Sequence, residues 1–206
     1  ISIIIIAATL RLWQIGNVPI SLDWDEAALG YNAYSIMLTG KDEYGKTFPV
    51  VLESFGDFKP ALYAYLIIPF ISILGLTEIA VRLPSALIGI IAVLLTYFLT
   101  KELFKQTDLA LTAAFLLAIS PWHIQFSRVA FEASVAMTLN LAAILFFLKG
   151  LKKPISFSVA AIFFSLSLYT YQSEKLFVPL MLLILIGIFF QQLKRVPKKN
   201  IIISIL

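Results

Sequence analysis

Long apolar blocks, separated by short polar segments, run along almost the whole of this chain of 206 residues. Blocks of about 16 to 20 apolar residues are long enough to cross a hydrocarbon layer as helices. A single cleaved signal peptide cannot explain so many of them. The pattern therefore predicts an all-α fold, a polytopic transmembrane helical bundle. The expected blocks cover roughly residues 1–15, 61–76, 84–100, 109–122, 133–148, 155–171, 176–192 and 201 onward.

Composition supports the membrane class. Sixty per cent of the residues are hydrophobic, against about 45–50% in soluble globular proteins. The chain has no cysteine, which excludes disulfides, thiolate chemistry and cysteine metal sites. It begins at Ile1 without a methionine and ends inside an apolar block, so we expect residues 1–206 to be the N-terminal part of one longer transmembrane domain.

Three basic loops set the expected topology. Lysine and arginine concentrate in residues 101–105, 149–153 and 194–199, and cytoplasmic loops of membrane proteins carry an excess of these residues. The segments 120–132 and 169–175 alternate with them and should face outward. Basic residues in short interhelical loops, rather than along one face, argue against a nucleic-acid partner.

The position of block 61–76 decides where the preceding polar loop lies. If this block spans the membrane, the loop is cytoplasmic and residue 1 lies outside. If it lies along the outer surface, the loop is outside and residue 1 lies inside. Tyr63, Tyr65 and Pro69 suit an interfacial or re-entrant helix, which favours the second arrangement. The first extracytoplasmic loop would then cover about residues 16–80.

This loop gathers most of the negative charge. Seven of the twelve acidic residues fall between Asp23 and Asp57. Carboxylates are costly to bury in hydrocarbon, so a cluster beside the membrane is a candidate working surface. Asp23 and Glu26 have the spacing of a capping box, which predicts a short amphipathic helix that ends at Gly40. Residues 41–45 should form a polar turn.

Asp25 and Glu26 are the first candidates for chemistry. Acids in the first turn of a helix are favoured by its dipole, which is a purely structural explanation for both. The capping arrangement uses Asp23 and Glu26 but leaves Asp25 free. A free carboxylate at the positive end of a helix stays ionised, as a general base must.

Lys59 and Arg82 are the candidate phosphate-binding cations. Lys59 precedes Pro60 at the expected start of block 61–76, and Arg82 lies at the head of the following span. Either could be an anchor that snorkels to lipid head groups. Either could instead provide a positive charge for a phosphate.

The remaining candidates are polar residues of the outward segments. Arg128 and Glu132 are four apart and share a helix face, so they could form a salt bridge, although this order is the weaker orientation. His123 is the only histidine, and one histidine makes no metal site, so we expect a structural or supporting role. Tyr171 and Lys175 could line a site or belong to an interfacial aromatic belt. All of them are expected on the outer side.

The order of these residues resembles the protein O-mannosyltransferase superfamily, of the GT-C class of glycosyltransferases. It is most similar to the bacterial branch that includes the lipid A aminoarabinose transferase. The resemblance covers essentially the whole chain. It is carried by Asp25-Glu26, by Phe58-Lys59-Pro60-Ala61-Leu62-Tyr63, by Ala80-Val81-Arg82-Leu83-Pro84-Ser85-Ala86-Leu87, by Ser120-Pro121-Trp122 and by Ser127-Arg128.

This resemblance implies a GT-C-like bundle with juxtamembrane helices in the first extracytoplasmic loop. It also implies inverting transfer of a sugar from a polyprenyl-phosphate carrier to an acceptor hydroxyl. Asp25 matches the family's catalytic acid and Glu26 its neighbour, whereas Lys59 and Arg82 match residues tied to the carrier phosphate and to activity. The eukaryotic enzymes have His-Pro-Pro where this chain has Lys59-Pro60-Ala61, and Glu132 lies one residue from the usual acidic position.

The chemistry agrees with these residue types. A carboxylate can take the proton of an attacking hydroxyl, and a phosphate leaving group needs only positive charge. The scheme requires no cofactor and no metal. We therefore expect a glycosyltransferase in the bacterial plasma membrane, active on the extracytoplasmic face. Its partners would be the bilayer and a polyprenyl-phosphate-linked sugar, with the acceptor left open between protein, lipid and glycan.

The alternative is a transporter or lipid-handling protein without covalent chemistry. Transporters place charged residues or broken helices near the middle of the membrane. The apolar blocks here are expected to be free of charge at their centres, which favours the enzyme. A non-catalytic scaffold is disfavoured because Asp25, Lys59 and Arg82 are all present.

Overall fold

The structure is a computed structural model that describes residues 1–194 and residue 196. The apolar block expected from residue 201 onward, and much of the basic loop 194–199, lie outside the described residues. The described part is mostly helical, as expected. Its helices are α1 (Ser2–Leu12), α2 (Trp24–Thr39), α3 (Leu62–Leu74), α4 (Glu78–Phe104), α5 (Thr107–Ile119), α6 (Pro121–Ser127), α7 (Glu132–Gly150), α8 (Ser156–Leu168), α9 (Glu174–Ile188) and α10 (Phe190–Leu193).

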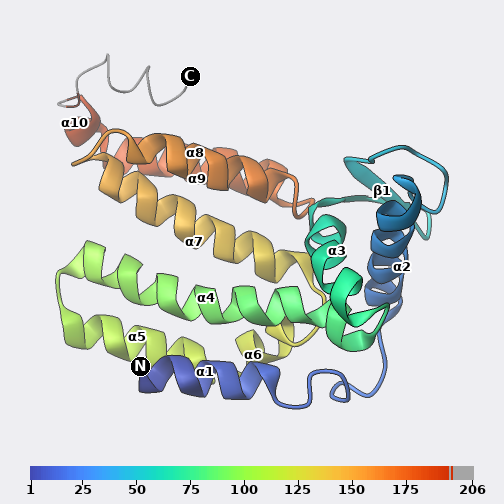
Figure 1. Cartoon of the computed structure of the whole chain (residues 1–206). Helices are drawn as coiled ribbons and strands as arrows, with labels where there is room; N and C mark the ends of the chain where they lie inside the picture. Colours follow the sequence, from blue (N-terminus) through green and yellow to red (C-terminus); the bar gives the residue numbers. More distant parts are fainter. Residues whose placement is uncertain (195, 197–206) are drawn as a thin grey trace.

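The long helices run side by side, and the first polar loop gathers at one end of them. In Figure 1 six helices lie roughly along one common axis: α1, α4, α5, α7, α8 and α9. Helices α2 and α3 lie across the right-hand end of this bundle. The α4–α5 and α7–α8 connections, which hold two of the basic loops, lie at the opposite end, where α1 begins. This is the arrangement expected if block 61–76 does not cross the membrane.

Two described helices, α4 and α7, are long and apolar enough to cross a membrane. A third candidate is the pair α5 and α6, which is bent by 61°. The blocks expected at 1–15, 61–76, 155–171 and 176–192 form shorter helices of 11 to 15 residues. Conversely, α4 is longer than predicted, because Thr77 caps it by accepting a hydrogen bond from the Ala80 N–H at 3.3 Å.

The capping box that opens α2 is confirmed. The Asp23 carboxylate accepts from the Trp24 N–H at 2.8 Å, and Glu26 accepts from the Asp23 N–H at 3.0 Å. Helix α2 ends at Gly40, whose φ of 69° lies in the left-handed region that glycine adopts at low cost. Both ends of this helix were therefore predicted correctly from the local sequence.

A small β-hairpin, which was not predicted, accompanies the helices. Strands β1 (Val51–Ser54) and β2 (Asp57–Pro60) pair antiparallel, with Leu52 opposite Lys59. Phe55 and Gly56 connect them, and both have positive φ (52° and 78°), as in a type I′ turn. Lys59 consequently lies in a strand rather than at the start of a helix.

Helix α3 buries one face against the rest of the protein. Tyr63, expected as an interfacial residue, is fully buried, and its hydroxyl donates to the Val81 carbonyl at 3.0 Å. Burial raises the pKa of this hydroxyl, which keeps it protonated as a donor. Ile67 and Ile71 pack in the same core cluster as Leu29 of α2. This cluster holds α2 in place over the end of the bundle.

Candidate active site

Asp25 and Lys59 form an ion pair at the end of the bundle that carries α2 and the hairpin. Asp25 lies in the first turn of α2, and β2 carries Lys59 back toward that turn from 34 residues further along the chain. The two side chains remain partly open, with 34% of Asp25 and 20% of Lys59 exposed. The pair therefore combines accessibility with a defined position.

An open cavity of about 250 Å³ lies beside this pair. Trp24 and Phe55 stand at its edge with ring centroids 6.1 Å apart, and both are more than two-thirds exposed. Exposed aromatic rings offer apolar faces to a sugar or a lipid chain. The cavity is lined by Trp24, Asp25, Ser54, Phe55, Asp57 and Lys59.

Glu26, the second catalytic candidate, is committed to the fold. Its side chain is 2% exposed. Besides capping α2, it accepts from Arg82 Nε at 2.9 Å, from Arg82 Nη2 at 3.0 Å and from the Ala130 N–H at 2.8 Å. These bonds join α2 to α4 and to the segment before α7. The position suits an anchor and leaves no open carboxylate face for a substrate.

Arg82, the second candidate for the carrier phosphate, donates its hydrogen bonds to protein acceptors in this structure. It is fully buried, and a guanidinium has five N–H donors. Two of these donate to Glu26, two to the carbonyls of Ile15 and Pro19 at 3.1 and 2.9 Å, and one to the Ser21 carbonyl at 2.7 Å. The arginine thus holds the α1–α2 connection against α4.

Arg128 and Glu132 do not pair with each other among the described residues. Arg128 instead donates to the carbonyls of Leu10 and Val18 at 3.0 and 2.8 Å, close to the segment that Arg82 holds. The salt bridge that their spacing allows is therefore not formed. Arg82 and Arg128 thus both donate hydrogen bonds to backbone carbonyls of the α1–α2 connection.

Glu132 begins α7 and is 6% exposed. It is close enough to Lys59 and Asp25 to interact electrostatically with both charges. The structure thus places a second carboxylate behind the ion pair, with little access to solvent.

The family of the chain follows from a comparison with protein-family models. The model described as dolichyl-phosphate-mannose-protein mannosyltransferase matches residues 58–205, well over half of the sequence. The chain belongs to this family. No curated protein and no solved structure matches the chain. The matched region contains Lys59 and Arg82 but begins after Asp25 and Glu26.

Membership in the mannosyltransferase family confirms the expected resemblance and a mannosyltransferase-type glycosyltransferase. It also implies a lipid-linked sugar donor, and together with the candidate spans it indicates an integral membrane protein. A transporter without covalent chemistry is correspondingly disfavoured.

In this mannosyltransferase-family chain, His123 lies in α6 and contacts α1. It is buried, and its Nδ1 lies 2.7 Å from Arg11 Nη2. Because a guanidinium can only donate, Nδ1 must be the acceptor, which places the ring proton on Nε2. Arg11 also donates to the Ala118 carbonyl at 3.0 Å, so the contact ties α6 and α5 to α1. No cluster of metal-ligating side chains occurs among the described residues.

Tyr171 and Lys175 lie on the α8–α9 side of the same end. Tyr171 is half-buried, with its ring 6.5 Å from that of Phe131, and Lys175 is exposed and donates to Gln172 at 3.1 Å. Two residues before Tyr171, the Tyr169 carbonyl accepts a hydrogen bond from the Leu62 N–H, at the start of α3, at 3.3 Å. Among the described residues, no hydrogen bond or ion pair joins Tyr171 or Lys175 to the Asp25–Lys59 pair.

Two buried polar clusters escaped the sequence analysis. Arg11 is fully buried although it lies inside an apolar block. Asn140, within the block 133–148, donates to Glu174 at 2.7 Å, and Ser167 donates to the same carboxylate oxygen at 2.7 Å. Arg11 and Asn140 are thus buried polar residues inside two of the expected apolar blocks. A single arginine or asparagine within an apolar block was the available signal.

Proposed function

We propose that the chain forms part of a membrane glycosyltransferase that moves a sugar from a polyprenyl-phosphate carrier to an acceptor hydroxyl on the extracytoplasmic face, with inversion. The observation that carries the proposal is the accessible Asp25–Lys59 pair beside an open cavity. It supplies a carboxylate for the acceptor and a cation for the carrier at one place.

In the proposed reaction, Asp25 accepts the proton of the acceptor hydroxyl as its oxygen attacks the anomeric carbon. The bond between that carbon and the carrier phosphate oxygen breaks on the opposite face, so the configuration inverts. The lipid phosphate leaves with the bonding electrons, and Lys59 stabilises its charge. The proton ends on Asp25, and no other reactant is needed.

The ion pair also orders these events. Lys59 contacts Asp25 in this structure. The phosphodiester of an arriving donor competes with the carboxylate for the ammonium group, and the lipid phosphate gains a second negative charge as the sugar leaves. Once Lys59 turns to the phosphate, Asp25 loses its partner and is available to the acceptor. Glu26, Arg82 and Arg128 are positioning residues in this scheme, because they hold the N-terminus of α2 where Asp25 must lie.

We expect Lys59→Ala to weaken binding of a polyprenyl-phosphate donor by roughly 10- to 100-fold, the range for one lost hydrogen bond to a charged group. Titration of the full-length protein with a fluorescent donor analogue measures the change. Lys46→Ala is the matched control, because Lys46 belongs to the same loop but pairs with Glu53 at 3.1 Å. Equal affinities of the Lys59 variant and the control would remove Lys59 from the donor site.

We further propose that the α2–hairpin end faces outward and the basic loops face the cytoplasm. The chain has no cysteine, so single cysteines can be introduced at exposed Thr47 and Lys153 without a background of native thiols. An impermeant thiol reagent added to intact cells should label Thr47→Cys and leave Lys153→Cys unlabelled until the cells are opened. Labelling of Lys153→Cys alone would indicate the opposite topology. Equal labelling of both cysteines in intact cells would contradict the proposed topology.

A further inference from the structure

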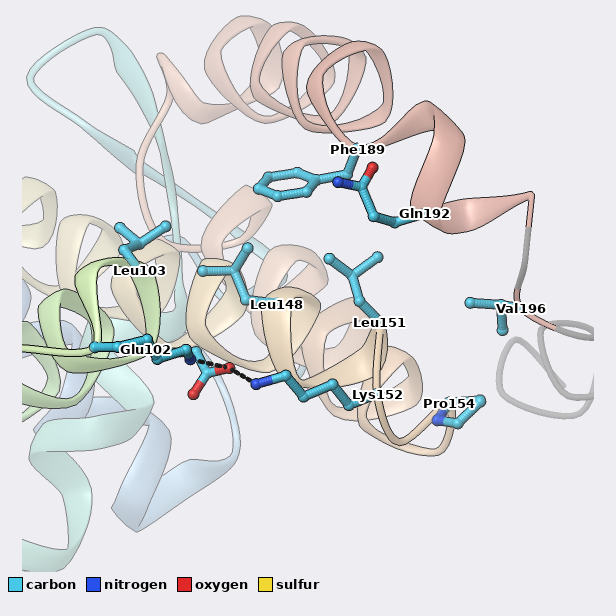
Figure 2. A pocket seen from close by; sticks show the side chains of 10 residues that line it. Glu102, Leu103, Leu148, Leu151, Lys152, Pro154, Phe189, Gln192 and Val196 are labelled. Carbon is cyan, nitrogen blue, oxygen red and sulfur yellow. Dashed lines mark hydrogen bonds and ion pairs between the residues drawn. The ribbon is translucent and has the colours of Figure 1, made fainter.

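The end of the bundle opposite Asp25 contains two adjoining cavities where α4 and α7 finish. The larger has a volume of about 680 Å³, and Figure 2 shows Leu103, Leu148, Leu151 and Phe189 around it. The smaller has a volume of about 250 Å³. Both cavities are bounded by Glu102 and Lys105. The smaller one is lined by Phe98, Lys101, Glu102, Lys105 and Lys149.

Positive charge dominates these cavities. Glu102 is the one carboxylate among their lining residues, and it pairs with Lys105 at 2.8 Å and with Lys152 at 2.7 Å. Lys101 donates to the Tyr97 hydroxyl at 3.2 Å, and Lys149 lies 5.1 Å from the Phe146 ring centroid. Neither of these two lysines has a carboxylate partner among the described residues. The smaller cavity therefore offers two cations without a counter-ion.

Helix dipoles and interfacial snorkelling explain why lysines occur at the ends of membrane helices. They do not explain an open cavity in which a cationic part adjoins an apolar part. Basic pockets between membrane helices are known sites for anionic lipid head groups. The apolar walls, which include Leu148 and Leu151, match the other half of such a molecule.

We propose that these cavities bind an anionic phospholipid. Its phosphate would lie in the smaller cavity between Lys101, Lys105 and Lys149, and one acyl chain would run along Leu148 and Leu151. The charge of the cavities, their position at the ends of the candidate spans α4 and α7, and their apolar walls favour a lipid over a soluble phosphate. The site lies a span's length from Asp25 and does not depend on the proposed sugar transfer.

Native mass spectrometry of the full-length protein, titrated with phosphatidylglycerol and with phosphatidylcholine, tests this site. The wild type should bind phosphatidylglycerol more tightly than phosphatidylcholine. Lys101→Gln combined with Lys149→Gln should weaken phosphatidylglycerol binding by roughly 25-fold, about fivefold for each lysine near a membrane surface. Binding of phosphatidylcholine should hardly change. Both lysines are exposed, so the substitutions leave the packed core intact.

The matched control is Lys153→Gln combined with Lys194→Gln, which removes the same charge from the same end without touching either cavity. This control should lose less than about twofold, because only non-specific attraction is reduced. Lys101→Arg with Lys149→Arg should keep the affinity. Equal losses of phosphatidylglycerol affinity in the Lys101/Lys149 variant and in the control variant would indicate diffuse attraction to the surface. Unchanged affinity in the Lys101/Lys149 variant would indicate that the cavities do not bind the lipid. Either result overturns the proposal.

Discussion

Asp25→Asn should abolish sugar transfer while the protein still folds and binds its donor. Asparagine keeps the shape of aspartate but cannot take the hydroxyl proton. Loss of a general base typically lowers the rate by about 10²- to 10⁴-fold. Donor affinity should be retained or increased, because Lys59 loses the carboxylate that competes with the carrier phosphate. Turnover and donor binding measured on the same preparation separate the two effects.

Asp23→Asn provides the control for Asp25→Asn. Asp23 lies two residues away, and its side chain caps α2. Asparagine caps helices about as well as aspartate, so this variant should be almost silent. If Asp25→Asn kept more than about a tenth of the wild-type activity, a smaller loss than removal of a base should give, Asp25 would not be the base. Glu132, the neighbouring buried carboxylate, would then be the next candidate.

Arg82→Gln should destabilise the protein strongly, because it breaks a buried ion pair and leaves several backbone carbonyls without their hydrogen-bond donor. Removing one partner of a buried pair costs about 3–5 kcal/mol. Arg82 is fully buried and Glu26 nearly so, and Glu26 would be left as an uncompensated buried charge. Glu26→Gln should have a similar effect, since it strands Arg82. The melting temperature of the full-length protein in detergent measures both variants.

Lys59→Gln is the matched comparison for Arg82→Gln. It also removes one cation from an ion pair, but that pair is partly exposed and worth about 1 kcal/mol or less. The two variants should therefore differ in which property they change most, stability or donor binding. Arg82→Gln should lower the melting temperature most, and Lys59→Gln should weaken donor binding most. A stable Arg82 variant that had lost donor binding would restore the role of phosphate ligand to Arg82.

Local signals in the sequence predicted local structure well. The spacing of Asp23 and Glu26 gave the start of α2, and Gly40 gave its end. The first polar loop, which was expected to gather the candidate residues, brings Asp25 and Lys59 together as an ion pair. These successes rest on contacts between residues close in sequence, or on rules that count charges along the chain.

Partners far apart in sequence could not be predicted in the same way. Glu26 and Arg82 are 56 residues apart, and each taken alone looks like a residue open to substrate. Nothing local shows that the arginine turns inward to the carbonyls of the α1–α2 connection. The hairpin that brings Lys59 to Asp25 was missed because Phe55-Gly56 is not one of the common turn pairs. In this structure Glu26 and Arg82 are buried partners of each other, whereas Asp25 and Lys59 remain partly accessible.

The most direct test is a structure of the full-length protein with a polyprenyl phosphate bound. The account predicts a phosphate oxygen within hydrogen-bond distance of Lys59 Nζ, about 2.7–2.9 Å for such charged pairs. Lys59 should then be parted from Asp25, whose carboxylate should face the open cavity beside the phosphate, while Arg82 remains bound to Glu26. A phosphate bound elsewhere, with the Asp25–Lys59 pair intact, would contradict the account.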